Sequence, residues 1–427
     1  MFSKTKGLIS NTHFVLIERL FTTLLSLLSI VAIARIMGAA DFGSFSYVSS
    51  VAGIFLAAGH LGLDGLLVKK FVEAPQRSST VMGTTFFLKF TVLFFSGLCL
   101  ISYGYYNPIH TGAEQLLFLF FGLIFLSNPV TSVLNAWFQA NEYFKFASTL
   151  RILVVLMATL LKLFLVFKSF SIDAVGLAHS AIFVVEAFLV YLLLRFLKGP
   201  NLKAWHFSSS LAKVLIKEGA PLFVGTILAI LYFKVDIIML RYFHDEVMVG
   251  NYALVPQVLQ LVQIFPIVLA MVAFPKLVRL LNVDEVNFLV NSKKLYSQIY
   301  ILAFILSITI FFIGGQILIL VFGEEYTPTV PALKIACGAI PFLFIRIFST
   351  RVFIAMNMGA HFVFFETIGL IVNIGINLAL IPQYGGEGAA IATVCSLFCS
   401  SIISLCLFEE SRKVLRIIFG GLIHIFN

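Results

Sequence analysis

Charge is scarce in this sequence. Only 11% of its 427 residues are charged, whereas 60% are hydrophobic and the mean hydropathy is +1.04. About a quarter of the residues of a soluble domain are charged, so this composition excludes a large soluble catalytic domain. A helix needs roughly 20 apolar residues to cross a bilayer. We therefore predict an all-α integral membrane protein with about 12 transmembrane helices.

Signatures of covalent chemistry are missing as well. The sequence contains no P-loop, no HExxH motif and no GxSxG motif. Its eight histidines are dispersed, and its five cysteines lie in apolar segments without a CxxC pair: Cys99, Cys337, Cys395, Cys399 and Cys406. These features predict no catalytic residue, no metal, no disulfide and no cofactor, and they favour a transporter over an enzyme.

Twelve apolar segments, bounded by charged residues, Pro or Gly, are long enough to span a membrane. They are 12–34, 43–66, 81–104, 114–135, 146–167, 175–196, 219–240, 250–274, 296–322, 331–350, 361–382 and 388–408. We expect four parts: a six-helix lobe at 1–198, a cytoplasmic linker with an amphipathic helix at 199–218, a second six-helix lobe at 219–408, and a cytoplasmic tail at 409–427 that forms an interfacial helix.

The basic residues are distributed unevenly between the two sides of this topology. Twenty of the 29 lysines and arginines fall on the side of Met1, and four fall on the other side, namely Arg35, Lys168, Arg241 and Lys334. Basic residues accumulate on the cytoplasmic side of membrane proteins, so both termini are predicted to be cytoplasmic. Because topology accounts for the scattered basic residues, we expect no nucleic-acid partner.

The two halves of the sequence share features at an offset of about 210 residues. Arg35 precedes Gly43-Ser-Phe45, and Arg241 precedes Gly250-Asn-Tyr252 in the same way. Pro129 corresponds to Pro341, and Gly176 corresponds to Gly388. Six spans in each half give both halves the same orientation, which predicts a parallel repeat with a central cavity between the lobes.

Ionisable residues inside the spans are the best functional signal, because each costs about 2.5–3.5 kcal/mol at a helix centre and should face protein or water. Arg19 begins a polar stripe at helical spacing that includes Ser26. Lys234 and Asp236 are two residues apart, so they cannot face each other and need partners on other helices. We predict the following roles: Arg19, Lys234, Arg346, Ser26, Asn373 and Asn377 line the cavity; Glu18, Asp236 or Glu366 binds a coupling ion; Arg35 and Arg241 lie at the cavity mouths.

A structural role remains open for the same residues, since interhelical ion pairs can fix helix packing. Lys89 and Lys162 lie near span ends, where a long side chain either lines the cavity or extends to the membrane interface. The cations outnumber the anions in the span interiors. A cavity with this bias favours an anionic cargo.

The stretch Ala34-Arg35-Ile-Met-Gly38-Ala-Ala-Asp-Phe42-Gly43-Ser-Phe45, followed by Leu61-Gly62-Leu63-Asp64 and Lys69-Lys70, resembles the Wzx-type flippases of polysaccharide biosynthesis. Their superfamily also contains multidrug exporters and the lipid II flippase. Gly250-Asn-Tyr252 and Asn357-Met-Gly359 extend the resemblance over nearly the whole chain.

The resemblance implies twelve helices in two lobes that alternate in their access to the two sides of a bacterial inner membrane. The cargo it implies is an oligosaccharide repeat unit linked to undecaprenyl pyrophosphate, such as an O-antigen unit, carried from the inner to the outer leaflet. H⁺ or Na⁺ is the implied coupling ion, and the polysaccharide polymerase machinery is a further implied partner. Two alternatives stay open: a multidrug cation antiporter of the same fold, and a membrane polymerase or glycosyltransferase.

Each alternative has a discriminating feature. A cation antiporter needs acidic residues to dominate the cavity. A polymerase or glycosyltransferase needs a large outer loop, and no outer connection here exceeds about 15 residues.

The topology can be tested by labelling cysteines in a chain whose five native cysteines are replaced by alanine. Asp41→Cys is expected to react with a membrane-impermeant maleimide in intact cells, because the loop at Asp41 is predicted to be outside. Ser208→Cys is expected to react only after permeabilisation. Labelling of Ser208→Cys in intact cells would reverse the orientation and contradict the charge argument.

Overall fold

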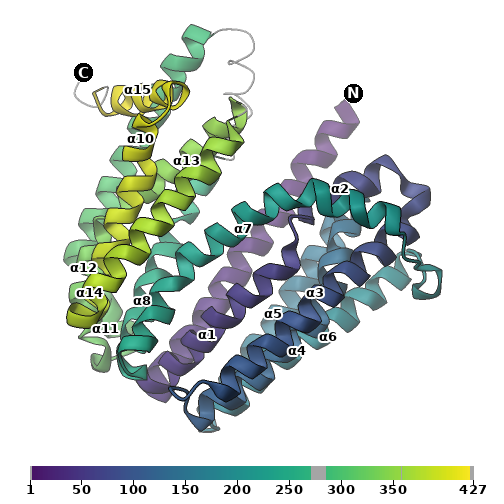
Figure 1. Cartoon of the computed structure of the whole chain (residues 1–427), viewed down its shortest axis with the longest axis horizontal. Coiled ribbons are helices and arrows are strands. Elements are labelled where there is room, and N and C mark those ends of the chain that lie inside the picture. The colour runs from purple at the N-terminus through teal and green to yellow at the C-terminus, as the bar shows by residue number, and fades with distance from the viewer. Residues whose placement is uncertain (1, 271–284, 357, 424–427) are drawn as a thin grey trace. The chain divides into compact units, whose positions relative to one another are not determined.

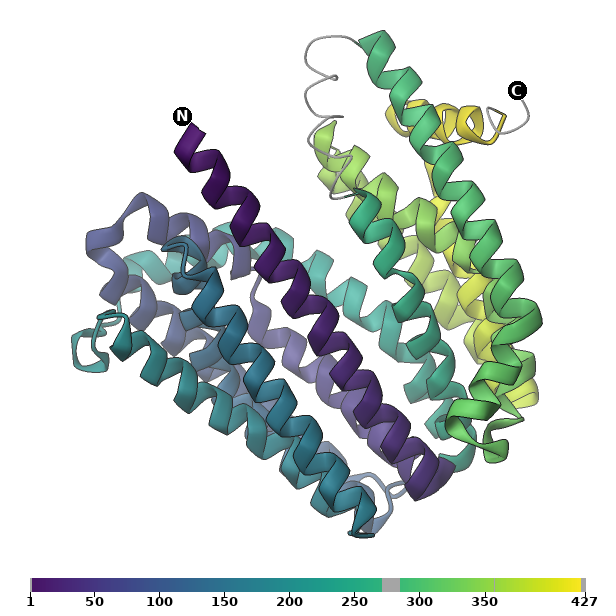
Figure 2. The same cartoon turned by 180° about the vertical axis from the view of Figure 1, so that it is seen from behind.

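The computed structural model describes residues 2–270, 285–356 and 358–423 (Figures 1 and 2). Throughout these ranges the regular structure is helical, without a strand. Nine of the described helices are long and apolar enough to cross a membrane, or ten if the bent pair Thr329–Cys337 and Ile340–Phe353 forms one span. The predicted class, an all-α integral membrane protein, is confirmed.

Two of these helices each contain two of the predicted spans. They cover Ile17–Glu73, 57 residues, and Val363–Cys406, 44 residues, which at 1.5 Å per residue is two to three times the thickness of a bilayer core. A glycine in the left-handed region interrupts each of them: Gly38, with a φ of 86°, and Gly385, with a φ of 49°. Both glycines lie where the sequence predicts the chain to turn between adjacent spans.

The chain divides into two compact units, 1–230 and 231–427. The first unit contains α1 Phe2–Ala57, η1 Ala58–His60, α2 Asp64–Glu73, η2 Pro75–Arg77, α3 Ser78–Tyr106, α4 Gly112–Ala140, α5 Phe144–Phe167, α6 Ile172–Phe196, η3 Leu202–Ala204 and the first part of α7 Ser209–Phe243. The second unit contains the rest of α7, α8 Glu246–Val262, α10 Glu285–Thr309, the π-helix η4 Ile310–Gly314, α11 Gly315–Phe322, η5 Glu324–Tyr326, α12 Thr329–Cys337, α13 Ile340–Ala355, α14 Gly359–Ser401, η6 Ile403–Cys406 and α15 Glu409–Ile423.

The core of the first unit forms around α4. Leu134 and Phe138 of α4 are buried against Leu67 and Phe71 of the short helix α2. Leu215 of α7 joins the same apolar cluster and is completely buried. This packing holds the beginning of α7 within the first unit.

The amphipathic segment predicted within the linker is the first part of α7. This helix begins at Ser209 and continues without interruption to Phe243. Gly219 approaches the loop after η1 so closely that a Cβ atom there would lie 2.4 Å from the carbonyl oxygen of Leu61. Beside this contact, Lys70 Nζ lies 3.2 Å from Glu218 Oε2. The end of the linker region and the seventh predicted span therefore form one continuous helix. Its contacts with the first unit extend as far as Gly219.

The C-terminal tail forms the helix α15, which packs on α10 and runs across its direction (Figures 1 and 2). Val414, Ile417 and Ile418 are buried. Gly421 lies against Tyr296 of α10, where a Cβ atom would meet the Tyr296 Cβ atom at 2.6 Å. The tail is thus an amphipathic helix with one face on the second unit.

Candidate functional site

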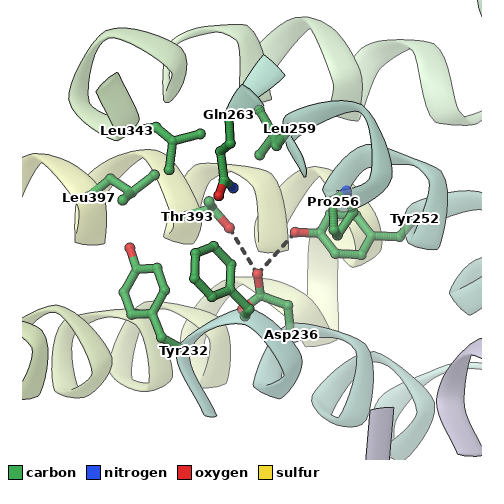
Figure 3. Close-up of a pocket in the computed structure, with 10 residues that line it drawn as sticks. Tyr232, Asp236, Tyr252, Pro256, Leu259, Gln263, Leu343, Thr393 and Leu397 are labelled. Carbon is green, nitrogen blue, oxygen red and sulfur yellow. Dashed lines mark hydrogen bonds between the residues drawn. The ribbon is translucent and has the colours of Figure 1, made fainter. Parts of the chain in front are cut away.

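A buried carboxylate, Asp236 of α7, lies at the centre of a polar cluster in the second unit (Figure 3). Its Oδ2 atom accepts hydrogen bonds from the Tyr252 hydroxyl of α8 at 3.1 Å and from the Thr393 hydroxyl of α14 at 2.9 Å. Its Oδ1 atom accepts one from Asn377 Nδ2 at 2.7 Å. Three side chains from two helices, α8 and α14, therefore donate to one carboxylate of α7.

The amide pair beside Asp236 has unused hydrogen-bonding capacity. Asn377 Nδ2 also donates to Asn373 Oδ1 at 3.0 Å. The Asn377 Oδ1 and Asn373 Nδ2 atoms are buried and have no hydrogen-bond partner among the described residues. These atoms can accept and donate further hydrogen bonds, and an unsatisfied buried polar atom costs about 1–3 kcal/mol.

A small cavity adjoins the cluster. Its lining residues come from α7, α8, α13, α14 and the break after α8: Tyr232, Phe233, Asp236, Tyr252, Pro256, Leu259, Gln263, Leu343, Thr393 and Leu397 (Figure 3). It offers about 30 Å³ to the centres of water molecules, which is room for about two waters. Asp236 can therefore receive water or a small ion from this side.

Arg346 of α13 forms an ion pair with Glu366 of α14. The Arg346 Nε atom donates to Glu366 Oε1 at 2.6 Å, and the Nη2 atom donates to Oε2. The guanidinium group also stacks over the Tyr232 ring, 4.7 Å from its centroid, and over the Phe233 ring at 5.2 Å. Both charged side chains are nearly buried, with 11% and 3% of their surface exposed. The structure thus places Arg346 and Glu366, predicted for cavity lining and ion binding, in one bidentate contact.

The side chains of Lys234 and Asp236 have different surroundings, although the two residues are close in sequence. Residues two positions apart on a helix project about 200° apart, and Asp236 projects toward α8 and α14. Lys234 is partly exposed, and no ion pair or hydrogen bond of its side chain occurs within the described part of the chain. Its ammonium group is therefore available to a ligand.

In the first unit, Arg19 and Ser26 lie on an exposed face of α1. The Thr23 hydroxyl of the same stripe donates to the Arg19 carbonyl oxygen at 2.7 Å. In the parts of the chain that the structure describes, the Arg19 guanidinium has no carboxylate partner. Arg19 in the first unit and Lys234 in the second are therefore cations without an ion pair to a described residue.

Glu18, the neighbour of Arg19, takes part in an ion-pair network. Arg151 Nε of α5 lies 3.4 Å from Glu18 Oε1, and Arg151 Nη1 lies 3.5 Å from Glu186 Oε1 of α6. One guanidinium is thus shared by two carboxylates. This network joins α1, α5 and α6 within the first unit.

The two arginines predicted at the cavity mouths differ in exposure. Arg35 is exposed, whereas Arg241 is buried and its Nη2 atom lies 2.6 Å from Glu246 Oε1 at the start of α8. The structure places Lys89 in an ion pair. Its ammonium group is buried and lies 2.8 Å from Asp64 Oδ1. Lys162 is partly exposed on α5 and has no ion pair among the described residues.

Sequence reasoning missed Tyr252, Thr393 and Arg151 as site residues. Tyr252 was used only as part of the internal repeat, and a single threonine in an apolar helix carries no distinctive signal. Arg151 lies near the start of the predicted span 146–167, where a basic residue is explained by topology alone. One signal was available: Asp236 cannot pair with Lys234, so it requires donors from other helices.

Comparison with known proteins assigns the chain to a family. The model of the family described as polysaccharide biosynthesis protein matches residues 8–281. The chain belongs to the polysaccharide biosynthesis protein family.

Two curated relatives and two solved structures extend this assignment. The chain is 24% identical to "Probable flippase AglR" of Haloferax volcanii over 86% of this chain and 76% of the relative. It is 22% identical to "Probable low-salt glycan biosynthesis flippase Agl15" of the same organism, over 91% and 80% of the two chains.

Among solved structures, this family member resembles the lipid II flippase MurJ in its inward closed conformation, with a TM-score of 0.74, 15% identity and coverage of 96% and 91% of the two chains. It also resembles an inward-facing MATE multidrug transporter, with a TM-score of 0.68, 13% identity and coverage of 93% and 95%. At these identities the likeness establishes the fold that the family member shares with both transporters.

The Arg346–Glu366 pair predicts a stability effect. Arg346→Gln and Glu366→Gln are each expected to reduce the amount of folded protein, because each leaves one buried charge without its partner at a cost of about 3–5 kcal/mol. The double variant removes both charges and should recover most of the loss. The measurement is the amount of monodisperse protein after detergent extraction.

Arg19→Gln is the matched control for this experiment, because Arg19 is exposed and has no carboxylate partner. Its yield should equal that of the unmodified chain. If the double variant is as poor as the single variants, the two charges do not stabilise the fold through each other.

Proposed function

We propose that this protein is a flippase that moves polyprenyl-pyrophosphate-linked oligosaccharide repeat units, such as O-antigen units on undecaprenyl pyrophosphate, from the inner to the outer leaflet. The observation that carries the proposal is the contrast between cations inside the helices. Arg346 and Lys89 form ion pairs with carboxylates, whereas among the described residues Arg19 and Lys234 form none. A cation without an ion pair inside an apolar helix is stable only if it faces water or binds an anionic ligand.

The physical barrier to flipping explains why such cations are needed. The pyrophosphate and sugars must leave water, and an unpaired charge in hydrocarbon costs many kcal/mol. Arg and Lys side chains replace part of the lost solvation through charge-assisted hydrogen bonds to the phosphate oxygens. The polyprenyl tail can remain in lipid throughout. The protein then needs two conformations with different access and no covalent step.

The names of the curated relatives, both probable flippases, support the activity. The fold shared with a MATE transporter raises the cation antiporter as the second candidate. A positively charged drug would be repelled by Arg19 and Lys234, so the unpaired residues favour an anionic cargo over a cationic one. The location we propose is a bacterial inner membrane with both termini cytoplasmic, as the distribution of basic residues predicts.

The proposal includes a coupling cation, H⁺ or Na⁺, at Asp236. Among the described residues no three His, Cys, Asp or Glu side chains come together, so a cation would be held by one carboxylate and neutral oxygens. Hard cations prefer oxygen ligands of this kind. The Asn377 amide can supply its oxygen by turning over, since the oxygen and nitrogen of an amide exchange places on rotation.

Thr393 suits the same role. Its hydroxyl lies 2.9 Å from Asp236 Oδ2 and 3.0 Å from the Ala389 carbonyl oxygen. A hydroxyl has one hydrogen, so when it donates to Ala389 its lone pairs are free for a cation beside Asp236. A cation held there would join α7 and α14, and a conformation that separates these helices would bind it more weakly. Coupling requires this difference in affinity between conformations.

The cargo proposal predicts that Arg19→Ala and Lys234→Ala abolish surface polysaccharide while protein abundance and membrane insertion stay normal. Truncating an unpaired cation removes an insertion penalty instead of adding one. Arg19→Lys should keep part of the activity if charge alone is needed, and little if a bidentate contact to the pyrophosphate is needed. Export is measured as surface polysaccharide against the amount of membrane-inserted protein.

Lys203→Ala is the control, because Lys203 is an exposed residue of η3 outside the spans. It should leave export unchanged. Unchanged export in both Arg19→Ala and Lys234→Ala at normal abundance would refute the cargo site. A loss of export that follows the loss of protein would indicate a packing role instead.

The coupling proposal is tested with the protein in liposomes under an imposed Na⁺ or pH gradient. Asp236→Asn should abolish the stimulation of transport by the gradient, and Thr393→Val should raise the cation concentration needed for half-maximal stimulation about tenfold, a loss of about 1.4 kcal/mol. Ser396→Ala is the matched control, one turn along α14. The Ser396 hydroxyl bonds the Tyr232 hydroxyl at 2.7 Å and not Asp236. Equal effects of both substitutions would remove Thr393 from the cation site.

A further inference from the structure

We propose that α15 binds the headgroups of anionic phospholipids. The helix has one face buried on the second unit and an opposite face that nothing in the described chain covers. The buried face consists of Ser411, Val414, Ile417, Ile418 and Gly421. The exposed residues are Arg412, Lys413, Arg416, Phe419 and Ile423.

The exposed residues are ordered along the helix. Arg412, Lys413 and Arg416 occupy its first half, whereas Phe419 and Ile423, with 46% and 61% of their surface exposed, occupy its second half. At 100° per residue, Arg412, Arg416, Phe419 and Ile423 project within about 60° of one another. The helix thus presents a continuous strip that is basic at one end and apolar at the other.

A fourth cation comes from α10. Gly420 lies on the side chain of Lys293, so that a Cβ atom at this position would meet Lys293 Cε at 2.8 Å. The absence of a side chain at Gly420 lets the Lys293 stem pass beside α15. No described carboxylate forms an ion pair with Lys293, Lys413 or Arg416. Arg412 donates through Nε to the Cys406 carbonyl oxygen at 2.9 Å, which leaves both Nη groups for a ligand.

The two acidic residues of α15 do not neutralise this strip. Glu410 lies 3.2 Å from His361 Nε2 of α14, and Glu409 occupies the first turn, where a negative charge favours the helix N-terminus. The surface formed by Lys293, Arg412, Lys413 and Arg416 keeps a positive excess. An occupant must therefore carry negative charge.

The orientation of α15 indicates that this occupant is a lipid surface. The helix runs across the direction of α10, which is long and apolar enough to cross the membrane, so α15 lies along the plane of the bilayer (Figures 1 and 2). A helix in this position can insert Phe419 and Ile423 among the acyl chains while its basic residues reach the phosphates. Charge complementarity then favours anionic over zwitterionic headgroups, by roughly fivefold for each basic residue.

Tryptophan quenching tests this proposal in the full-length protein. Phe419→Trp introduces a reporter on the exposed strip, and the emission of the parent chain, which contains only two tryptophans, is subtracted. The protein is reconstituted with brominated phosphatidylglycerol or brominated phosphatidylcholine, each diluted in unlabelled phosphatidylcholine. Quenching is expected to occur at a several-fold lower content of the anionic lipid. The preference should fall in 0.5 M salt, because screening shortens the range of the attraction.

The charge requirement is tested in the same background with Arg412→Gln, Lys413→Gln and Arg416→Gln combined. The preference for phosphatidylglycerol should be largely lost, while quenching by phosphatidylcholine remains, since Phe419→Trp still contacts the interface. The matched control changes three other exposed basic residues, Lys198, Lys203 and Lys213, to Gln. It should keep the preference.

Three results would overturn the proposal. Equal quenching by both lipids in the parent background means that the strip does not select anionic headgroups. Quenching by neither lipid means that protein covers the helix. A preference that survives the triple substitution means that other residues bind the lipid. If Phe419→Trp lowers the yield of folded protein, Ile423→Trp replaces it as the reporter.

Discussion

An ionisable side chain inside a membrane-spanning helix must find a partner or keep contact with water, because even the most permissive scale gives a cost of about 2.5–3.5 kcal/mol at the helix centre. The polar architecture of this protein follows from that constraint. Arg346 and Glu366 satisfy each other through two hydrogen bonds, and Asp236 is satisfied by three neutral donors. Each solution requires contacts between different helices, so the contacts that satisfy charge also join α13 to α14 and α7 to α8 and α14.

The constraint also separates structural from functional charge. A paired cation such as Arg346 is explained by packing, and its loss is costly because the partner stays buried. Arg19 and Lys234 form no ion pair with any residue that the structure describes, so ion pairing within the described chain does not explain them. The Asp236 cluster lies between these cases: its carboxylate is satisfied, yet the neighbouring Asn377 Oδ1 and Asn373 Nδ2 atoms are not. A polar cluster with spare acceptors and donors beside a small cavity is suited to a ligand that comes and goes.

The sequence predicts more of the fold than of the candidate site. Length and hydropathy predict the helices because a bilayer sets one length for every span, and Gly38 and Gly385 lie where the sequence predicts turns. The continuity of α7 was not predictable in this way, because Lys213 and Lys217 interrupt the apolar run without interrupting the helix. In the site, Glu366, Asn373 and Asn377 are recognisable from sequence because polar residues are rare inside apolar spans. This criterion gives no means of finding that Glu366 binds Arg346, since that pairing depends on how α13 and α14 pack.

The continuous helix α7 connects these features. Its first part is fixed in the first unit by Leu215 and by the close contact of Gly219 with Leu61, and its last part carries Asp236 within the second unit. Between these points the helix is partly buried from Gly225 to Leu231, and the Thr226 hydroxyl donates a hydrogen bond to the Leu222 carbonyl oxygen at 2.9 Å. A hydroxyl bonded one turn back is a feature that bends helices. In the proposed mechanism a cation at Asp236 therefore acts on an element whose other end belongs to the first unit.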